Sequence, residues 1–284
     1  MEDLLVEETP LEVYRVESRI VHVKREDMCC RNFGPPFSKM RGVYKHLLRL
    51  KKEGCSTIGY VDTKVSMAGW GVAWCAKHLG LRAVVFDPQY QDAGDVLPLH
   101  RKKWEQFGAE IVPIQPSRMS IVHARAEKIF REKFGQKAIL LKDGLPFDET
   151  IEETSKQWRR TAERIKPRTT VVVVGSGTIC AGILSGWNGE GDIVGILCAS
   201  KLVEKKQSSI LRRAGVLHGG LFGVRLQLVD PGWTYTEPSL SDCPFPCNRY
   251  YDLKAWQWLV ENINRLEGPI LFWNIGRNID DGEE

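Results

Sequence analysis

The feature that most constrains the fold of this chain is a repeated alternation between short apolar, β-branched runs and longer segments with helical periodicity. In the first half, runs such as 57–61 and 83–86 are almost continuously apolar, and the helical segments that follow end at glycines. Strands that are apolar along their whole length, alternating with helices of 10–15 residues, are typical of a parallel sheet covered on both faces. The sequence therefore predicts an α/β fold.

A turn at residues 143–146 separates two series of such units. We expect two parallel-sheet βα domains: a large one of residues 1–50 and 145–284, and a smaller one of residues 51–144. Ligands of such folds bind at the carboxyl ends of the strands, so we expect a cleft between the two domains. The expected strands are 57–61, 83–86, 110–114, 138–141, 170–174, 194–198, 226–229 and 269–273, and the expected helices are 69–79, 97–107, 120–134, 148–165 and 253–266.

Composition excludes several classes of protein. With 284 residues, 43% of them hydrophobic and 27% charged, the chain can bury a sizeable core and is neither disordered nor fibrous. It has no apolar run of membrane-spanning length, and its acidic start is unlike a secretory signal, so we expect a cytoplasmic protein with no membrane partner. The eight cysteines and six histidines lack metal-site spacing, which predicts reduced thiols and no bound metal. A net charge of +4 permits a nucleic-acid partner without requiring one.

A glycine-rich loop follows the most apolar run of the chain. Residues 171–174 are four valines, and Gly175, Ser176, Gly177 and Thr178 come directly after them. Glycines let backbone N–H groups approach an anion, the two hydroxyls add donors, and the dipole of a following helix favours negative charge. The pattern departs from a dinucleotide fingerprint and indicates a compact monophosphate site, with a tight turn that binds nothing as the alternative.

Lys39 stands in an unusual position, at the expected start of a helix. A lysine there opposes the helix dipole, so helix stability does not explain it. Burial next to Phe37 and Met40 would lower its pKa and make it a usable amine nucleophile. An ordinary exposed lysine is the alternative.

Basic and aromatic residues give weaker signals. The basic runs 101–103, 159–160 and 205–206 are typical of solvated faces, unless they lie on one side of the molecule. Trp70, Trp74 and Trp273 fall near the expected cleft, where aromatic rings could stack on a flat substrate, although packing in the core is the more ordinary role.

The order of the motifs carries more information than any one of them. Along the chain come Lys-Arg-Glu-Asp at 24–27, Ser-Lys-Met-Arg-Gly at 38–42, a strand–loop–helix unit, Gly-Ser-Gly-Thr at 175–178, Tyr-Asp-Leu-Lys-Ala at 251–255 and Phe-Trp-Asn-Ile-Gly at 272–276. This order resembles the fold-type II pyridoxal-phosphate (PLP) enzymes, a group that includes the tryptophan synthase β chain, D-cysteine desulfhydrase and aminocyclopropane-carboxylate (ACC) deaminase. The resemblance covers most of the chain and implies a cofactor cleft between the two domains.

The resemblance assigns roles to particular residues. It implies that Lys39 holds PLP as a Schiff base and afterwards acts as an acid or base, and that Tyr251 is a second proton-transfer group. The phosphate of PLP would be bound by the loop formed by Gly175, Ser176, Gly177 and Thr178. Asn274 would lie beside the cofactor ring, and Thr63 and Ser66 would bind the substrate.

Two positions depart from the family pattern. Met67 occupies the place of an asparagine that contacts the ring hydroxyl in relatives, and Ile275 occupies the place of a Ser or Thr that contacts the pyridine nitrogen. Both departures mean that the substrate cannot be copied from a well-known member.

The resemblance implies a PLP-dependent lyase, deaminase or decarboxylase that acts at Cα of an amine or amino acid through Schiff-base chemistry. One alternative is a phage-type DNA-modification enzyme that reworks, for example decarboxylates, an amino acid attached to thymine in DNA. A catalytically inactive cofactor-binding protein is the second alternative. The predicted partner is a small amine or amino-acid substrate, or an amino-acid base linked to DNA. The sequence is also compatible with a homodimer.

Overall fold

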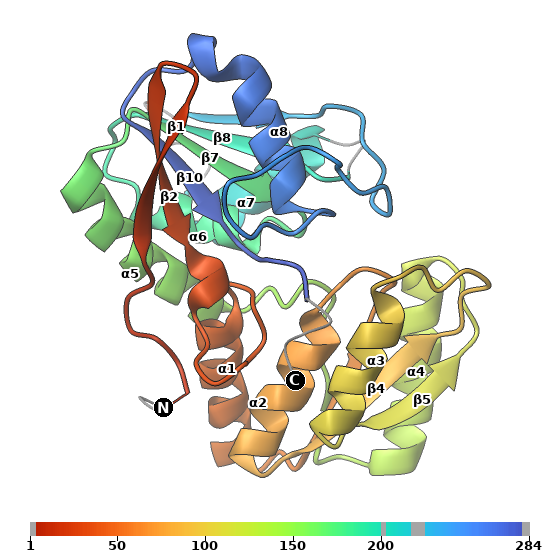
Figure 1. Ribbon diagram of the computed structural model, residues 1–284. Helices are drawn as coiled ribbons and strands as arrows, with labels where there is room; N and C mark the ends of the chain where they lie inside the picture. Colours follow the sequence, from red (N-terminus) through yellow and green to blue (C-terminus); the bar gives the residue numbers. More distant parts are fainter. Residues whose placement is uncertain (1–3, 200–202, 217–224, 280–284) are drawn as a thin grey trace. The chain divides into compact units, whose positions relative to one another are not determined.

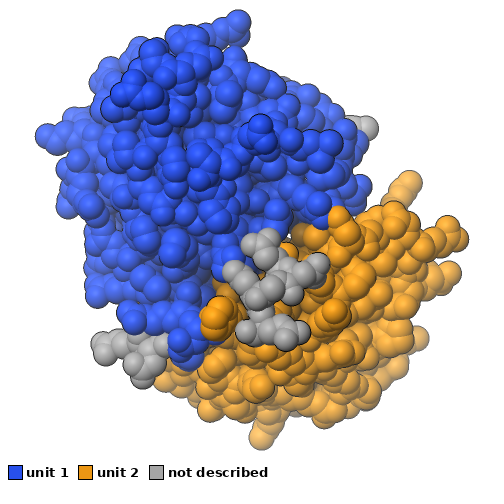
Figure 2. Space-filling view, in the orientation of Figure 1, with its two compact units in different colours: residues 1–32, 36–42, 148–278 blue, residues 33–35, 43–147, 279–284 orange. Residues whose placement is uncertain are grey.

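The computed structural model describes residues 4–199, 203–216 and 225–279 (Figure 1). The chain divides into two compact units, coloured separately in Figure 2. Unit 1 contains residues 1–32, 36–42 and 148–278, and unit 2 contains residues 33–35, 43–147 and 279–284. The chain passes from unit 1 to unit 2 inside helix α1 (Met40–Lys52), so Lys39 belongs to unit 1. The domain division expected from the sequence stays a prediction.

Unit 1 is built on a six-stranded sheet with the order β1-β2-β10-β7-β8-β9. Its strands are β1 (Leu11–Val16), β2 (Arg19–Arg25), β7 (Thr169–Val174), β8 (Asp192–Leu197), β9 (Leu226–Val229) and β10 (Ile270–Asn274). The pair β1–β2 is antiparallel, and every other neighbouring pair is parallel. Because the parallel strands run the same way, their carboxyl ends meet at one edge of the sheet.

Helices cover both faces of this sheet (Figure 1). They are α5 (Asp148–Ile165), α6 (Thr178–Gly186), α7 (Val203–Arg213) and α8 (Asp252–Asn262), with short 3-10 turns at Glu26–Met28 and Ile263–Arg265. Alternate residues of β7 point to opposite sides: Val171 and Val173 pack in a core with α8, and Val172 and Val174 pack in a core with α5, α6 and α7. Burial on both faces explains why these strands are apolar throughout.

Unit 2 has a four-stranded, fully parallel sheet with the order β5-β4-β3-β6. Its strands are β3 (Thr57–Val61), β4 (Arg82–Pro88), β5 (Glu110–Ile114) and β6 (Ala138–Leu140), and its helices besides α1 are α2 (Ala68–Leu79), α3 (Leu97–Gln106) and α4 (Met119–Phe134). Phe86 and Phe130 pack in its core.

The prediction of an α/β fold with parallel sheets is confirmed. Each strand and helix expected from the sequence is present within a few residues of its expected bounds. The sequence missed β1, β2 and α7. The hairpin lies at the edge of the sheet, where Val13 and Ile20 are exposed and weaken the apolar signal. Helix α7 is mostly polar and buries only Ile210, so it lacks the apolar positions by which the other helices were predicted.

Candidate active site

Lys39 is held at the carboxyl end of β10. The Ser38 backbone N–H donates to the Ile275 carbonyl at 2.8 Å, and the Arg277 N–H donates to the Pro36 carbonyl at 3.2 Å. These bonds join the segment that leads into α1 to the segment that leaves β10. Lys39 is thereby fixed near the sheet edge where the parallel strands end.

The glycine loop lies beside this lysine, within unit 1. The Lys39 ammonium donates to Ser176 Oγ at 3.1 Å, and Ser176 Oγ lies 3.0 Å from Thr178 Oγ1. The loop connects β7 to α6, so the amide groups of the first turn of α6 point at the same region. Four residues predicted to act together are therefore adjacent: Lys39, Ser176, Gly177 and Thr178.

Gly177 is required sterically. Its φ is +83°, and a Cβ there would lie 2.8 Å from Ile210 Cγ1 and 3.1 Å from an Arg213 guanidinium nitrogen. Gly175 is different, because a Cβ there would make only ordinary contacts, the nearest at 3.6 Å to Cys198 and to the Tyr251 ring.

Two cations from α7 also reach this loop. Lys206 donates to the Gly175 carbonyl at 2.8 Å, and Arg213 donates to the Ser176 carbonyl at 2.6 Å and to Thr178 Oγ1 at 3.1 Å. Neither residue was predicted as part of the site, since the run 205–206 is typical of a solvated face and no local pattern marks Arg213. Their spacing of seven positions, which puts both on one face of a helix, is the signal that could have found them.

Positive charge and burial act together on Lys39. Desolvation by burial is the main cause that lowers its pKa to about 8, and the nearby Arg213 and Lys206 lower the pKa further. A sizeable fraction of Lys39 is therefore neutral near pH 8, whereas an ordinary lysine is fully protonated there. A neutral amine is the form that attacks a carbonyl carbon.

Tyr251 lies next to the glycine loop at the start of α8. Its hydroxyl hydrogen-bonds the Tyr235 hydroxyl, and the two rings meet edge to face. The ring of Tyr251 is the nearest side chain, together with Cys198, to the open side of Gly175. Tyr251 is thus in the same neighbourhood as the loop predicted to hold the phosphate.

Asn274 is fully buried and committed to other groups of the protein. Its amide nitrogen donates to Asp27 and to the Pro246 carbonyl, both at 3.0 Å, and its amide oxygen accepts a long bond from the Cys247 thiol. These bonds show Asn274 organising the core under β10, and a contact with the cofactor ring stays a prediction.

A buried carboxylate fixes the turn after β10. Asp252 accepts from the backbone N–H groups of Ile275 at 2.7 Å and Gly276 at 3.0 Å. Desolvation holds the pKa of Asp252 well above its usual range. No local pattern around Asp252 indicates this role, because the two partners lie more than twenty residues away.

Thr63 and Ser66 belong to unit 2, in the loop between β3 and α2. The organising group there is Asp62, which is fully buried: it accepts from the Thr63 N–H at 2.9 Å and the Gly69 N–H at 2.8 Å. Ser66 Oγ accepts from the Ala68 N–H at 3.1 Å. Met67 lies just before α2 and is buried, so no asparagine side chain is available at that position.

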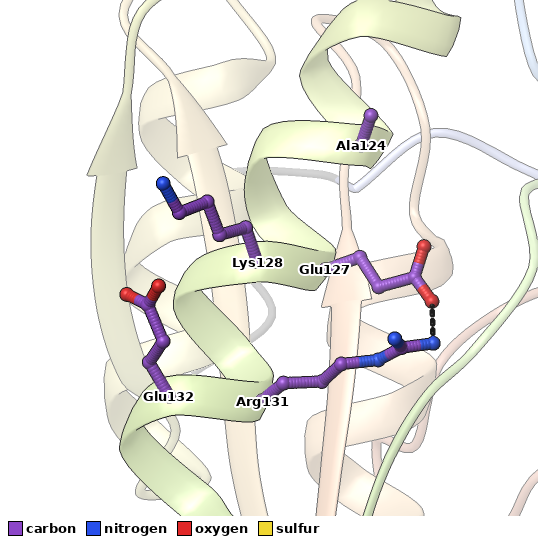
Figure 3. Close-up of a pocket in the computed structure, with 5 residues that line it drawn as sticks. All are labelled: Ala124, Glu127, Lys128, Arg131 and Glu132. Atoms are coloured by element: carbon purple, nitrogen blue, oxygen red, sulfur yellow. Dashed lines mark hydrogen bonds and ion pairs between the residues drawn. The ribbon is translucent and has the colours of Figure 1, made fainter.

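Three tryptophans and a surface hollow do not form part of a candidate site. Trp70, Trp74 and Trp273 are at most 2% exposed, so their rings pack inside the protein. The hollow drawn in Figure 3 lies on α4, where Ala124, Glu127, Lys128, Arg131 and Glu132 come from one solvated helix and Glu127 pairs with Arg131 at 2.5 Å.

The described part of the chain shows neither a metal-binding cluster nor a membrane-spanning helix. It contains no cluster of His, Cys, Asp and Glu that could hold a metal ion. No described helix combines the length and apolarity that crossing a bilayer demands. None of the eight cysteines, all of which lie in the described residues, forms a disulfide bond.

A phosphate group fits the donor set around residues 175–178. The site combines a helix N-terminus, two hydroxyls, a glycine whose Cβ would obstruct the loop, and three cations, Lys39, Lys206 and Arg213. Such a set favours a compact anion of high charge. The fold and this site together define an α/β protein with a candidate phosphate site beside a buried lysine amine.

Comparisons with known proteins specify this class. The family model described as pyridoxal-phosphate dependent enzyme matches residues 3–215. A "Glycyl-dTMP PLP-dependent decarboxylase" of Pseudomonas phage M6 is 35% identical over 285 residues, which cover 96% of this chain and 100% of the relative.

Solved structures with the same fold are more distant in sequence. A crystal structure of an ACC deaminase homologue superposes with a TM-score of 0.81 at 22% identity, covering 96% of this chain and 90% of that one. A hydrogen sulfide-producing enzyme from Fusobacterium nucleatum gives a TM-score of 0.66 at 14% identity, covering 95% of each chain.

This chain belongs to the family of pyridoxal-phosphate dependent enzymes. The predicted cofactor, PLP, and the predicted Schiff-base chemistry at Cα are confirmed at the level of the family, and so is the fold-type II resemblance. The protein is an enzyme, which favours the catalytic prediction over an inactive cofactor-binding shell.

Proposed function

We propose that this enzyme decarboxylates a glycyl group attached to thymine in a nucleotide, and that DNA carries this nucleotide. The observation that supports the proposal is the similarity to the phage decarboxylase, which extends over the whole of that relative and nearly the whole of this chain. The distant solved structures support only the fold.

The chemistry requires an electron sink and a set of protein groups. When bound, PLP supplies conjugation that accepts the electron pair left at Cα as CO2 departs. In our proposal, residues 175–178 would hold its phosphate group, and Lys39 would hold its carbonyl carbon. The low pKa of Lys39 would suit both roles of this amine, as a neutral nucleophile and as a group that carries a proton for Cα.

Tyr251 is the proposed second proton-transfer group. Its hydrogen bond with Tyr235 orients the phenol, and its ring borders Gly175. The Tyr235→Phe variant removes the hydroxyl that orients Tyr251 while keeping the ring, so it should reduce kcat with little effect on PLP binding.

The test is to incubate the PLP-loaded enzyme with an oligonucleotide that carries one glycyl-dTMP. Mass spectrometry should show loss of one CO2 from this oligonucleotide, and the Lys39→Ala variant should show none. The matched oligonucleotide with unmodified dTMP is the control. Turnover of a free amino acid, with the glycyl oligonucleotide left intact, would overturn the proposal in favour of a small-molecule enzyme.

Salt dependence tests the partner separately. A DNA enzyme must neutralise backbone phosphates, so its affinity for the oligonucleotide should fall steeply between low and moderate salt. With a net charge of only +4, we expect modest affinity overall. Equal binding at both salt concentrations would contradict a DNA partner.

A further inference from the structure

Helix α7 carries its basic residues in two rows. Lys205 and Arg212 are exposed, whereas Lys206 and Arg213, one position further along in each case, are partly buried. Residues seven positions apart share a face of a helix, so each row is a pair on one side of α7. The two rows have the same charge and differ in what they contact.

The partly buried row contacts the glycine loop and nothing acidic. Among the described residues, the oxygens that accept from Lys206 and Arg213 are the carbonyls of Gly175, Ser176 and Ser209 and the hydroxyl of Thr178. Burial lowers the pKa of Lys206, and repulsion from Arg213 lowers it further. No carboxylate among the described residues bonds Lys206 or Arg213, so these two cations approach the loop without a balancing negative charge.

An uncompensated cluster of this kind is costly unless an anion joins it. The loop lies at the N-terminus of α6, whose dipole adds to the positive potential. Backbone N–H groups alone are neutral donors, and charge-assisted bonds are about twice as strong as neutral ones.

We propose that Lys206 and Arg213 supply the positive charge that binds a phosphate group at the glycine loop, with the phosphate of PLP as the ligand. The two side chains hold the loop from its carbonyl side and leave its N–H groups to the phosphate. Charge balance then links the phosphate to the amine: a bound dianion offsets the two cations, so it raises the pKa of Lys39.

The experiment compares PLP with pyridoxal, which lacks the phosphate. Lys206→Gln and Arg213→Gln should each weaken PLP binding by about tenfold, as expected for the loss of one charge-assisted contact. Pyridoxal binding should change by less than about twofold, because pyridoxal has no phosphate group for these cations to attract. The matched controls Lys205→Gln and Arg212→Gln remove the same charge from the exposed row and should leave both affinities unchanged. Equal losses in both rows would overturn the proposal.

A second measurement separates charge from mere support of the loop. In the cofactor-free protein, the pH profile of Lys39 labelling by an amine-reactive reagent reports its pKa. Inorganic phosphate should move that profile to higher pH in the wild type, and Lys206→Gln or Arg213→Gln should also move it to higher pH. A role limited to loop support would weaken PLP binding without moving the profile, and that result would contradict the proposal.

Folding and the source of the phosphate need their own controls. The charge-preserving variants Arg213→Lys and Lys206→Arg should keep PLP affinity within about threefold, provided that charge matters more than shape. A loss as large as in the glutamine variants would contradict this.

Oligonucleotide affinity should be the same in wild type and in Arg213→Gln. If the variant loses DNA binding and keeps PLP, the phosphate belongs to the nucleotide, and our assignment to the cofactor is wrong.

Discussion

Two loops of this protein have the same topology and opposite electrostatics. Residues 175–177 connect buried strand β7 to α6, and residues 62–67 connect buried strand β3 to α2. In unit 1 the strand is followed by Gly175, and the side chains around the loop are cations. In unit 2 the strand is followed by Asp62, whose carboxylate accepts the Thr63 and Gly69 N–H groups.

The difference shows which local feature determines whether a helix N-terminus binds an external anion. Both termini present N–H groups that need an acceptor. In unit 2 the chain supplies that acceptor itself, so the loop is satisfied internally. In unit 1 the Thr178 N–H makes only a long bond of 3.5 Å to Ser176 Oγ, and a phosphate group would be a stronger acceptor there. One residue after the strand, glycine or aspartate, accounts for most of the contrast.

The largest effect should come from removing the amine beside the unit 1 loop. Lys39→Ala should abolish the absorption band of the covalently bound cofactor, because Lys39 is the amine that donates to Ser176 Oγ. The fold should survive, since Lys39 precedes α1 and opposes its dipole. Absorbance before and after borohydride treatment measures this. Lys64→Ala is the control, and a band that persists in Lys39→Ala would point to Lys24 or Lys64 instead.

The next largest effect should come from closing the unit 1 loop. Gly177→Val places a branched side chain at φ +83°, where its Cβ would lie 2.8 Å from Ile210. We expect PLP affinity to fall by about a hundredfold or more, from strain of about 1–3 kcal/mol and the loss of backbone approach to the phosphate.

Gly189→Val is the matched control for backbone strain. Gly189 also has a positive φ, +94°, but a Cβ there meets nothing within 4 Å. A similar loss of PLP affinity in both variants would mean that strain alone, not closure of the loop, causes the effect.

The contrast also marks what a sequence can predict. Gly177 and Lys39 were predictable because a glycine after four valines and a lysine before a helix are local patterns. Lys206 and Arg213 lie 31 and 37 positions from the carbonyls they contact, so only the packing of α7 on the loop reveals them. From the sequence alone, a run of solvated basic residues cannot be distinguished from a pair of basic residues that binds a ligand.

Long-range bonds limit the prediction for Asn274 in the same way. The family resemblance predicts that Asn274 lies beside the cofactor ring. In the structure its amide nitrogen donates to Asp27, which is 247 positions away in the sequence. The fold class was easier, since β7, β8 and β10 are apolar along their length. The edge hairpin β1–β2 was not, because an edge strand exposes part of each face to water.

A smaller effect should follow from changing the internal anion of unit 2. Burial raises the pKa of Asp62 to about 7, against an unfolded value of 3.8. The folded state therefore binds more protons between these values, and stability falls as pH rises from about 4 to 7. Asp62→Asn keeps one acceptor and removes the titration.

Thermal unfolding at several pH values tests this prediction. Asp62→Asn should lose about 1–3 kcal/mol at low pH, because an amide nitrogen replaces one acceptor of a buried N–H. The difference from wild type should shrink as pH rises through 7. A constant difference between pH 4 and 8 would show that Asp62 does not titrate in this range.

The smallest effect should come from Ser66, whose hydroxyl completes the unit 2 loop. Ser66 Oγ accepts from the Ala68 N–H at 3.1 Å, at the first residue of α2. Ser66→Ala should cost about 0.5–1.5 kcal/mol of stability, the net worth of a typical intramolecular hydrogen bond, and should leave PLP affinity unchanged. Thermal unfolding and a PLP titration measure the two quantities. The Ser66 side chain also hydrogen-bonds Asp62, so its hydroxyl is engaged within the loop. A rise in KM for the glycyl oligonucleotide with unchanged stability would show that this loop, too, binds a group from outside.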